Sequence, residues 1–313
     1  MFEQMLWGVL QVILLIMLAP LVQGFVKKVK ARLQNRVGPG IFQPYYDIIK
    51  YLKKDAVVSN HASWLTTSTP YLTFTVIIAA GLFVPTIWNE APLGVVGDII
   101  VIIYLFALAR FFTALSALDA GSSFGGMGSS RDMALSAIAE PALFLAVVAV
   151  LLEGGTTKLG QVITQVAEGH LNFLDPAYGL AFLAMLIVVI TETGRIPVDN
   201  PDTHLELTMI HEGMLLEYSG RYLGLMVWAS YIKQLLILTL FIDLFFPWGI
   251  ATTPTLTGMF YAAGAYLLKL LSLGTVLAFI ETAYAKVRLF QVPKLLASSM
   301  ALSLLAIIVR VVR

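Results

Sequence analysis

The feature that most constrains this chain is a series of apolar stretches that recur along nearly its whole length. A helix rises 1.5 Å per residue, so about 20 apolar residues cross a hydrocarbon core about 30 Å thick. Of the 313 residues, 58% are hydrophobic and only 12% are charged, whereas about 25% of the residues in a soluble domain are charged. The sequence therefore predicts an all-α integral membrane protein.

Neither a fixed-period repeat nor a low-complexity tract divides the chain, so residues 1–313 are expected to form a single membrane domain, a bundle of about eight transmembrane helices. The first apolar stretch is expected to be retained, because it lacks the positively charged leader of a signal peptide. The predicted spans are residues 5–25, 70–88, 97–118, 132–152, 176–193, 222–246, 256–281 and 293–311.

Lys and Arg are distributed unevenly between the connecting segments, and positively charged segments resist translocation across a membrane. Residues 27–54 alone hold eight of the 20 basic residues. Assigning this segment to the cytoplasm places fourteen of them on that side and both termini outside. Arg310 and Arg313, at the outer C-terminus, are exceptions to the rule.

Two of the cytoplasmic segments carry structural signals of their own. Residues 41–57 place apolar and charged side chains on opposite faces of a helix, which fits an amphipathic helix in the membrane interface and equally a solvated loop helix. Pro and Gly punctuate residues 194–221, which favours short helices and turns packed against the bundle. With its histidines neutral this second segment has a net charge of −3, so we describe it as an acidic loop.

Ionisable residues inside the predicted spans are the strongest indication of function. A charge at membrane depth costs about 2.5–3.5 kcal/mol, so such residues usually face a partner or a wet cavity. Glu140, Lys233 and Lys269 lie nearest mid-span and favour a functional site, although a buried ion pair that locks helix packing is the alternative. The full set is Arg110, Glu140, Glu192, Lys233, Asp243, Lys269 and Glu281.

The acidic loop gathers carboxylates that can raise one another's pKa by repulsion and desolvation, so that some would exchange protons near neutral pH. A solvated acidic loop is the alternative. Glu206 and Glu217 would share nearly the same helical face if a helix continued through Gly213. The loop's carboxylates are Asp199, Asp202, Glu206, Glu212 and Glu217.

Several other kinds of site are excluded or disfavoured. The chain has no Cys, which excludes thiolate-bound zinc and iron–sulfur clusters ligated by this chain. His211 and Glu212 begin a zinc-binding HExxH pattern, but Leu215 occupies the place of the second His. Residues 125–128 are Gly-rich and predict a tight turn, with Ser129 or Ser130 capping the fourth span. A net charge of +1 gives no field that would attract nucleic acid.

Four ordered strings carry a family resemblance: ARLQNRVGPGIFQPYYDIIKYL, GGMGSSRDMALSAIAEP, ETGRIPVDNPDTHLELTMIHEGMLLEYSG and AKVRLFQVPKLL. They resemble the respiratory complex I subunit 1 family. Within it they are most similar to the membrane-anchor subunit of group 4 nickel–iron hydrogenases, the branch of formate hydrogenlyase subunit 4 and hydrogenase-4 component C. The resemblance covers the chain from the first span to the eighth.

This resemblance implies a non-catalytic subunit in a bacterial or archaeal plasma (inner) membrane. It would dock a cytoplasmic module, made of a hydrogenase large subunit and an iron–sulfur small subunit, and join it to antiporter-like membrane subunits. The nickel–iron centre and the iron–sulfur clusters would lie in those partners, with no cofactor in this chain. Redox chemistry would then be linked to proton or sodium translocation through buried carboxylates.

The resemblance and the buried charges together assign roles to individual residues. Glu192, Arg195 and Asp199 match the family's string after the fifth span, and Glu140 resembles its buried glutamate of the fourth span. The proton-pathway candidates are Glu140, Glu192, Asp199, Asp202, Glu206, Glu212, Glu217, Lys233 and Lys269. The docking candidates are Arg36, Gly38, Pro39, Gly40, Arg131, Arg195, Tyr218 and Arg288.

Departures from the quinone-reducing members of the family disfavour quinone binding. Val198 stands where those members have Phe, and residues 200–204 replace an alanine-rich acidic run. A quinone-binding subunit of a complex I-like dehydrogenase is nevertheless the first alternative. The second is a standalone secondary transporter that uses Lys233, Lys269 and Glu140 as its substrate site.

Overall fold

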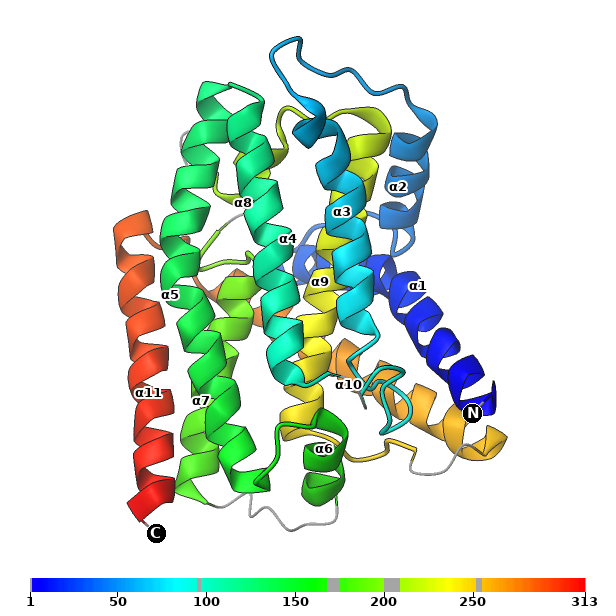
Figure 1. The fold of residues 1–313 in the computed structure, drawn as a ribbon, viewed down its shortest axis with the longest axis vertical. Helices are drawn as coiled ribbons and strands as arrows, with labels where there is room; N and C mark the ends of the chain where they lie inside the picture. The colour runs from blue at the N-terminus through cyan, green and yellow to red at the C-terminus, as the bar shows by residue number, and fades with distance from the viewer. Residues whose placement is uncertain (1, 95–96, 168–174, 200–208, 252–254, 313) are drawn as a thin grey trace.

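The computed structural model describes residues 2–94, 97–167, 175–199, 209–251 and 255–312, and over these residues the fold is all-helical (Figure 1). Six helices are long and apolar enough to cross a membrane. They are α1 (Phe2–Leu33), α4 (Ile99–Asp119), α5 (Ser123–Gly154), α9 (Gly220–Phe245), α10 (Leu256–Ala283) and α11 (Val292–Val312). The protein is therefore a multi-pass membrane protein.

Two shorter helices occupy the remaining predicted spans, namely α3 (Trp64–Gly81) and α7 (Pro176–Glu192). The smaller elements are α2 (Gln43–Lys53), α6 (Leu159–Ala167), α8 (His211–Leu215) and the 3₁₀ turn η1 (Leu289–Gln291). Within the described part of the acidic loop, α8 is the only helix and it spans five residues.

Two helix starts differ from the predicted spans because polar caps, and not hydropathy, set them. The third element begins at Trp64, six residues before the predicted 70–88, because the Ser63 side chain accepts a hydrogen bond from the Leu65 N–H at 3.2 Å. The fifth begins at Ser123, where the Ser122 hydroxyl accepts from the Gly125 N–H at 3.0 Å. The predicted turn at residues 125–128 is therefore wrong, and these glycines are helical.

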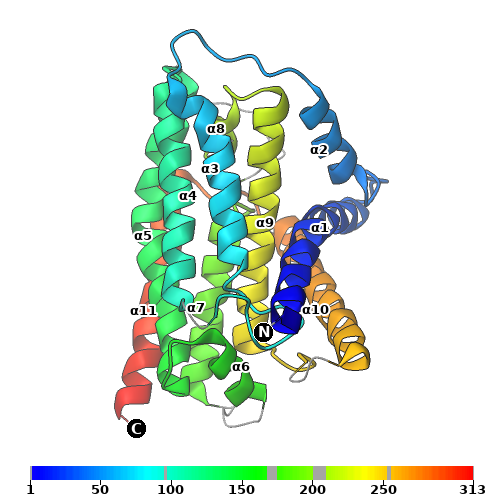
Figure 2. The same ribbon diagram turned by 45° about the vertical axis from the view of Figure 1, so that its right-hand side comes forward.

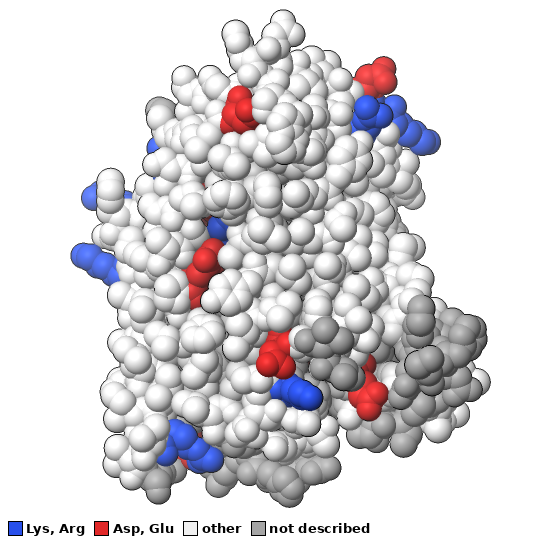
Figure 3. Space-filling view, viewed as in Figure 1, with Lys and Arg blue, Asp and Glu red and all other residues white. Residues whose placement is uncertain are grey.

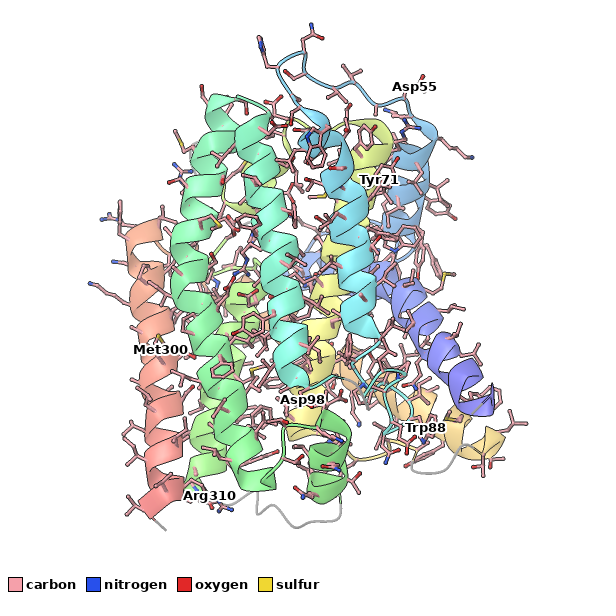
Figure 4. All side chains as sticks on the ribbon, in the orientation of Figure 1. Asp55, Tyr71, Trp88, Asp98, Met300 and Arg310 are labelled. Atoms are coloured by element: carbon pink, nitrogen blue, oxygen red, sulfur yellow. The ribbon has the colours of Figure 1, made fainter. Side chains whose placement is uncertain are left out.

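The upright helices form one bundle, and α1 and α10 lean away from it side by side (Figures 1 and 2). Asp55 and Arg310 lie toward opposite ends of the molecule (Figure 4). Both chain termini lie in the half that contains Arg310 (Figure 1). We call the end with Asp55, α2 and α8 the α8 end.

The surface is dominated by uncharged side chains, and charged ones are few and scattered over the face seen in Figure 3. On α4 the exposed residues include Tyr104, Leu108 and Phe111, which are suited to contact with lipid or with other membrane subunits. On α2, Ile48 is buried while Ile49 and Leu52 stay exposed. One apolar side of α2 thus remains uncovered in this chain.

Candidate functional site

A cavity of about 440 Å³ lies inside the bundle and extends toward the α8 end. Nine of the 26 residues that line it are Asp, Glu, Lys or Arg, so it is a wet and charged space and not an apolar ligand pocket. The charged lining residues are Lys27, Asp47, Arg110, Asp132, Glu192, Arg195, Asp199, Glu212 and Lys233.

Arg110, on α4, is the centre of a buried ion network. Its Nη2 atom lies 2.5 Å from Glu192 Oε2, and its Nη1 atom lies 3.2 Å from Glu140 Oε1. Its Nε atom lies 3.8 Å from Asp132 Oδ2. The Arg110 side chain is only 8% exposed, and Glu192, the last residue of α7, is 3% exposed. One guanidinium therefore joins α4 to acids from α5 and α7.

Lys233, on α9, supplies the second cation of this network. Its Nζ atom lies 3.0 Å from the same Glu192 oxygen that Arg110 contacts, and it lies over the Phe106 ring at 5.9 Å from the centroid. Glu192 thus stays ionised between two cations, as a buried carboxylate must when it is not protonated. Arg110, Lys233 and their three acids carry a net charge of −1.

His211 completes the charge balance from α8. Its Nδ1 atom lies 3.0 Å from Asp132 Oδ1. Burial alone would lower the pKa of His211, but attraction to the Asp132 carboxylate and the hydrogen bond between them outweigh burial and raise this pKa above its usual value. When His211 is protonated, the network around Arg110 is neutral. Its side chain lines the cavity, so a proton can reach it.

Two glycines bring α8 close enough for this contact. A Cβ atom on Gly128 of α5 would lie 3.1 Å from backbone atoms of Ile210, Gly213 and Met214. The helices therefore meet backbone to backbone. Asp132 lies one helical turn after Gly128 and faces His211 for this reason.

A second ion network borders the cavity near the ends of α1 and α10. Arg195 contacts Glu281 at 2.5 Å and Gln23 at 2.5 Å, and Lys30 contacts Glu281 at 3.2 Å. Arg195 is 5% exposed. Asp199 pairs with Lys286 at 2.8 Å and also accepts from the His211 backbone N–H at 3.4 Å. Asp199 therefore links this second network to α8.

The proton-pathway candidates are only partly brought together. Glu192, Lys233, Asp199 and Glu212 line the cavity. Glu140 contacts Arg110, but its side chain is 38% exposed, so the expectation of a buried mid-span acid is wrong for it.

Of the remaining candidates, Glu217 is partly buried and lies away from the cavity lining. Lys269 lies on α10, where its field reaches Asp243 and not the network around Arg110. Asp202 and Glu206 lie outside the described residues.

The docking candidates divide into exposed and buried groups. Arg36, residues 38–40 and Arg288 are exposed, and Arg131 is partly buried and donates to the Met209 carbonyl oxygen at 3.1 Å. Arg195 and Tyr218 are buried. Tyr218 hydrogen-bonds to Ser116, so both of these residues act inside the chain and not on its surface.

Sequence reasoning missed Asp132, His211 and Glu281. The predicted fourth span places Asp132 in the first turn of its helix and near water, whereas the helix begins nine residues earlier, at Ser123. His211 carried no motif, and its partner is 79 positions away in the chain. Among the described residues no cluster of three or more His, Asp or Glu side chains could hold a metal ion.

Comparisons with known proteins cover almost the whole chain. Residues 6–311 match the NADH dehydrogenase family. Formate hydrogenlyase subunit 4 of Escherichia coli (strain K12) is 35% identical over 303 residues, which are 97% of this chain and 97% of that protein. Hydrogenase-4 component C of the same organism is 34% identical over 283 residues, or 90% and 88% of the two chains.

More distant relatives lead to quinone-reducing enzymes and to a solved complex. A membrane protein of the NADH-quinone oxidoreductase of Salinibacter ruber is 25% identical over 286 residues, 87% of this chain and 82% of that protein. A chain of the membrane-bound sulfane sulfur reductase, an archaeal respiratory membrane complex, superposes with a TM-score of 0.83 over 97% of this chain and 99% of that one. Their sequence identity is 20%, so this likeness is one of fold.

Proposed function

Because this chain belongs to the NADH dehydrogenase family, we propose that it is the membrane-anchor and coupling subunit of a multisubunit hydrogen-evolving nickel–iron hydrogenase. The two E. coli relatives support the hydrogenase branch, since each matches at least 88% of its own length. The subunit itself would be non-catalytic. It would link redox chemistry in a docked module to movement of protons or sodium ions across the membrane.

The observation that carries this proposal is the Glu192 carboxylate held between Arg110 and Lys233 beneath a charged cavity. The cavity extends toward the α8 end, while the ion network lies among membrane helices. A charge change at the cavity wall, for example at His211, therefore acts on groups at membrane depth. This arrangement suits a coupling element better than an anchor alone.

The α8 end suits docking of a cytoplasmic module. Lys28, Arg36 and the basic side of α2 lie on or near the surface there, and the exposed Ile49 and Leu52 add apolar area. Interfaces combine such an apolar patch with a polar rim. The proposed partners are the hydrogenase large subunit and the iron–sulfur small subunit at this end, and antiporter-like subunits within the membrane.

The coupling role can be tested with the purified complex in sealed vesicles, using reduced methyl viologen as electron donor. Hydrogen evolution and the internal pH are recorded together, with and without sodium. Glu192→Gln is expected to remove most of the ions moved per hydrogen formed, because it leaves Arg110 and Lys233 without their shared anion. Glu140→Gln should have a smaller effect in the same direction.

Glu90→Gln is the matched control, because Glu90 is exposed and outside both ion networks. It should keep the wild-type ratio of ions moved to hydrogen formed. An unchanged ratio in Glu192→Gln would refute the carboxylate pathway. Failure of any nickel–iron module to co-purify would refute the hydrogenase assignment.

A quinone-binding subunit of a complex I-like dehydrogenase is the second candidate, favoured by the similarity to the NADH-quinone oxidoreductase of Salinibacter ruber. The cavity volume lies within the range of about 300–1,000 Å³ that small-molecule sites occupy. Its charged lining fits the apolar body of a quinone poorly. Assaying quinone reduction and hydrogen evolution on the same preparation separates the two functions.

A further inference from the structure

A second buried acid, Asp243, lies on α9 outside both ion networks. It is 3% exposed, and its Oδ2 atom has no hydrogen-bond partner among the described residues. Asp243 follows Lys233 by ten positions, which places it about 15 Å farther along the helix. It therefore lies near the end of α9 that is opposite to the α8 end (Figure 1).

A carboxylate that is buried without hydrogen bonds is costly, and more so at membrane depth. The neighbouring hydroxyls are already engaged. Thr239 donates to the Leu235 carbonyl oxygen at 2.8 Å, so the contact of 2.6 Å between Thr239 and Tyr266 leaves Tyr266 as the donor. Neither hydroxyl proton is then free for Asp243.

The ionisable groups around Asp243 are few. On α10, Lys269 lies three residues after Tyr266 and is the charged side chain whose field reaches Asp243. On α7, Tyr178 donates to the Leu244 carbonyl oxygen at 2.7 Å and is likewise engaged. The packed helix α6 has no ionisable side chain. A hard cation would also find too few free oxygen ligands here.

We propose that Asp243 and Lys269 form a second proton-binding site, in which Asp243 takes up and releases a proton and Lys269 balances the charge that remains. On release, the O–H bond of the Asp243 carboxyl breaks and the proton passes to water. The carboxylate left behind is then stabilised by the ammonium group of Lys269. The ligand of this site is a proton.

The two helices that carry this site also reach the ion networks described above. On α9, Lys233 contacts Glu192, and on α10, Glu281 contacts Arg195. Any change in how α9 and α10 pack at the networks also changes the separation of Asp243 and Lys269. The role of this site in ion translocation rests on the proposed function, whereas its protonation can be measured without turnover.

Infrared difference spectroscopy of the purified complex tests the proposal. The wild type is expected to show a carbonyl-stretch band of a protonated, apolar carboxyl that is lost in Asp243→Asn. Lys269→Met should hold that band to higher pH, and Lys269→Arg should restore the wild-type behaviour. Asp98→Asn is the control, because Asp98 accepts a hydrogen bond from Thr157 at 2.8 Å and should give no such band (Figure 4 labels Asp98).

A spectrum of Asp243→Asn that keeps every carboxyl band would overturn the proposal. Where that variant does not assemble, labelling the wild-type complex decides the matter. Dicyclohexylcarbodiimide adds to protonated carboxyls in apolar surroundings, and mass spectrometry should find it on Asp243, with less label as the pH rises. Absence of label on Asp243 at every pH would contradict the site. Co-purification of a different redox module would overturn only the proposed function, since the band and label are read on this chain.

Discussion

Arg110→Met is the substitution that tests the ion network most directly. Methionine keeps much of the side-chain volume and removes the charge. The change leaves Glu192, Glu140 and Asp132 with Lys233 as the only cation in direct contact, through Glu192. The net charge of the network goes from −1 to −2 with His211 neutral.

The expected cost follows from burial. Removing one partner of a buried ion pair costs about 3–5 kcal/mol, because the other charge remains without compensation. For a chain of this size 1 kcal/mol shifts the melting temperature by about 2 °C, so Arg110→Met should melt about 6–10 °C lower than the wild type. Arg110→Lys keeps the charge but cannot reach three acids with one planar group, so an intermediate loss is expected.

The assay is thermal unfolding at pH 7, followed by intrinsic fluorescence, of the detergent-purified complex and of this chain after separation from its partners. The double variant Arg110→Met, Glu192→Gln restores the net charge of −1. It should therefore recover part of the lost stability relative to Arg110→Met. The pair thus has a sign that a simple packing defect would not produce.

Two outcomes would refute this reasoning. The first is an Arg110→Met variant that melts within 2 °C of the wild type, a shift of about 1 kcal/mol, because a buried cation shared by three acids cannot be lost at so small a cost. The second is a double variant that melts below Arg110→Met, because removing an uncompensated anion should not destabilise further.

Two further predictions concern α8. The raised pKa of His211 means that its pairing with Asp132 stabilises the fold fully below about pH 6.5 and that this contribution is lost as the pH rises through the folded-state pKa. Melting temperatures measured across this range should fall with pH in the wild type and less steeply in His211→Gln; parallel curves would contradict the pairing. Gly128→Val should push α8 away and speed proteolysis near α8, since its Cβ would meet backbone atoms at 3.1 Å, whereas Gly126→Val, with open space around its Cβ, should not. Equal proteolysis of the two variants would refute the close contact.

The membrane character and the helical fold followed from the sequence because hydropathy reports directly on burial in lipid. Helix ends were harder, since a single side chain can set them. Ser122 adds nine residues to the start of α5 relative to the predicted span, and no apolar residue announces this extension. The error then concealed the position of Asp132 within the third turn of its helix.

The site was predicted in part for a related reason. Glu192 and Lys233 were found because charges in apolar surroundings are conspicuous in a sequence. Their pairing through Arg110 was not predictable, because it depends on which faces of α4, α7 and α9 meet. Lys269 shows the converse, since the same kind of signal led to a residue that lies with Asp243 on the far side of α9 and α10 from the first network.

The network has a second arrangement within reach that its geometry makes visible. Arg110 Nε and Asp132 Oδ2 are both buried without a hydrogen-bond partner and lie 3.8 Å apart. Shortening that distance by about 0.8 Å would create a normal hydrogen bond. Protonation of His211 competes for Asp132, whereas its deprotonation releases Asp132 toward Arg110 and so weakens the hold of Arg110 on Glu192. A proton at the cavity wall and a charge at membrane depth are thereby coupled through one guanidinium, without any movement of a domain.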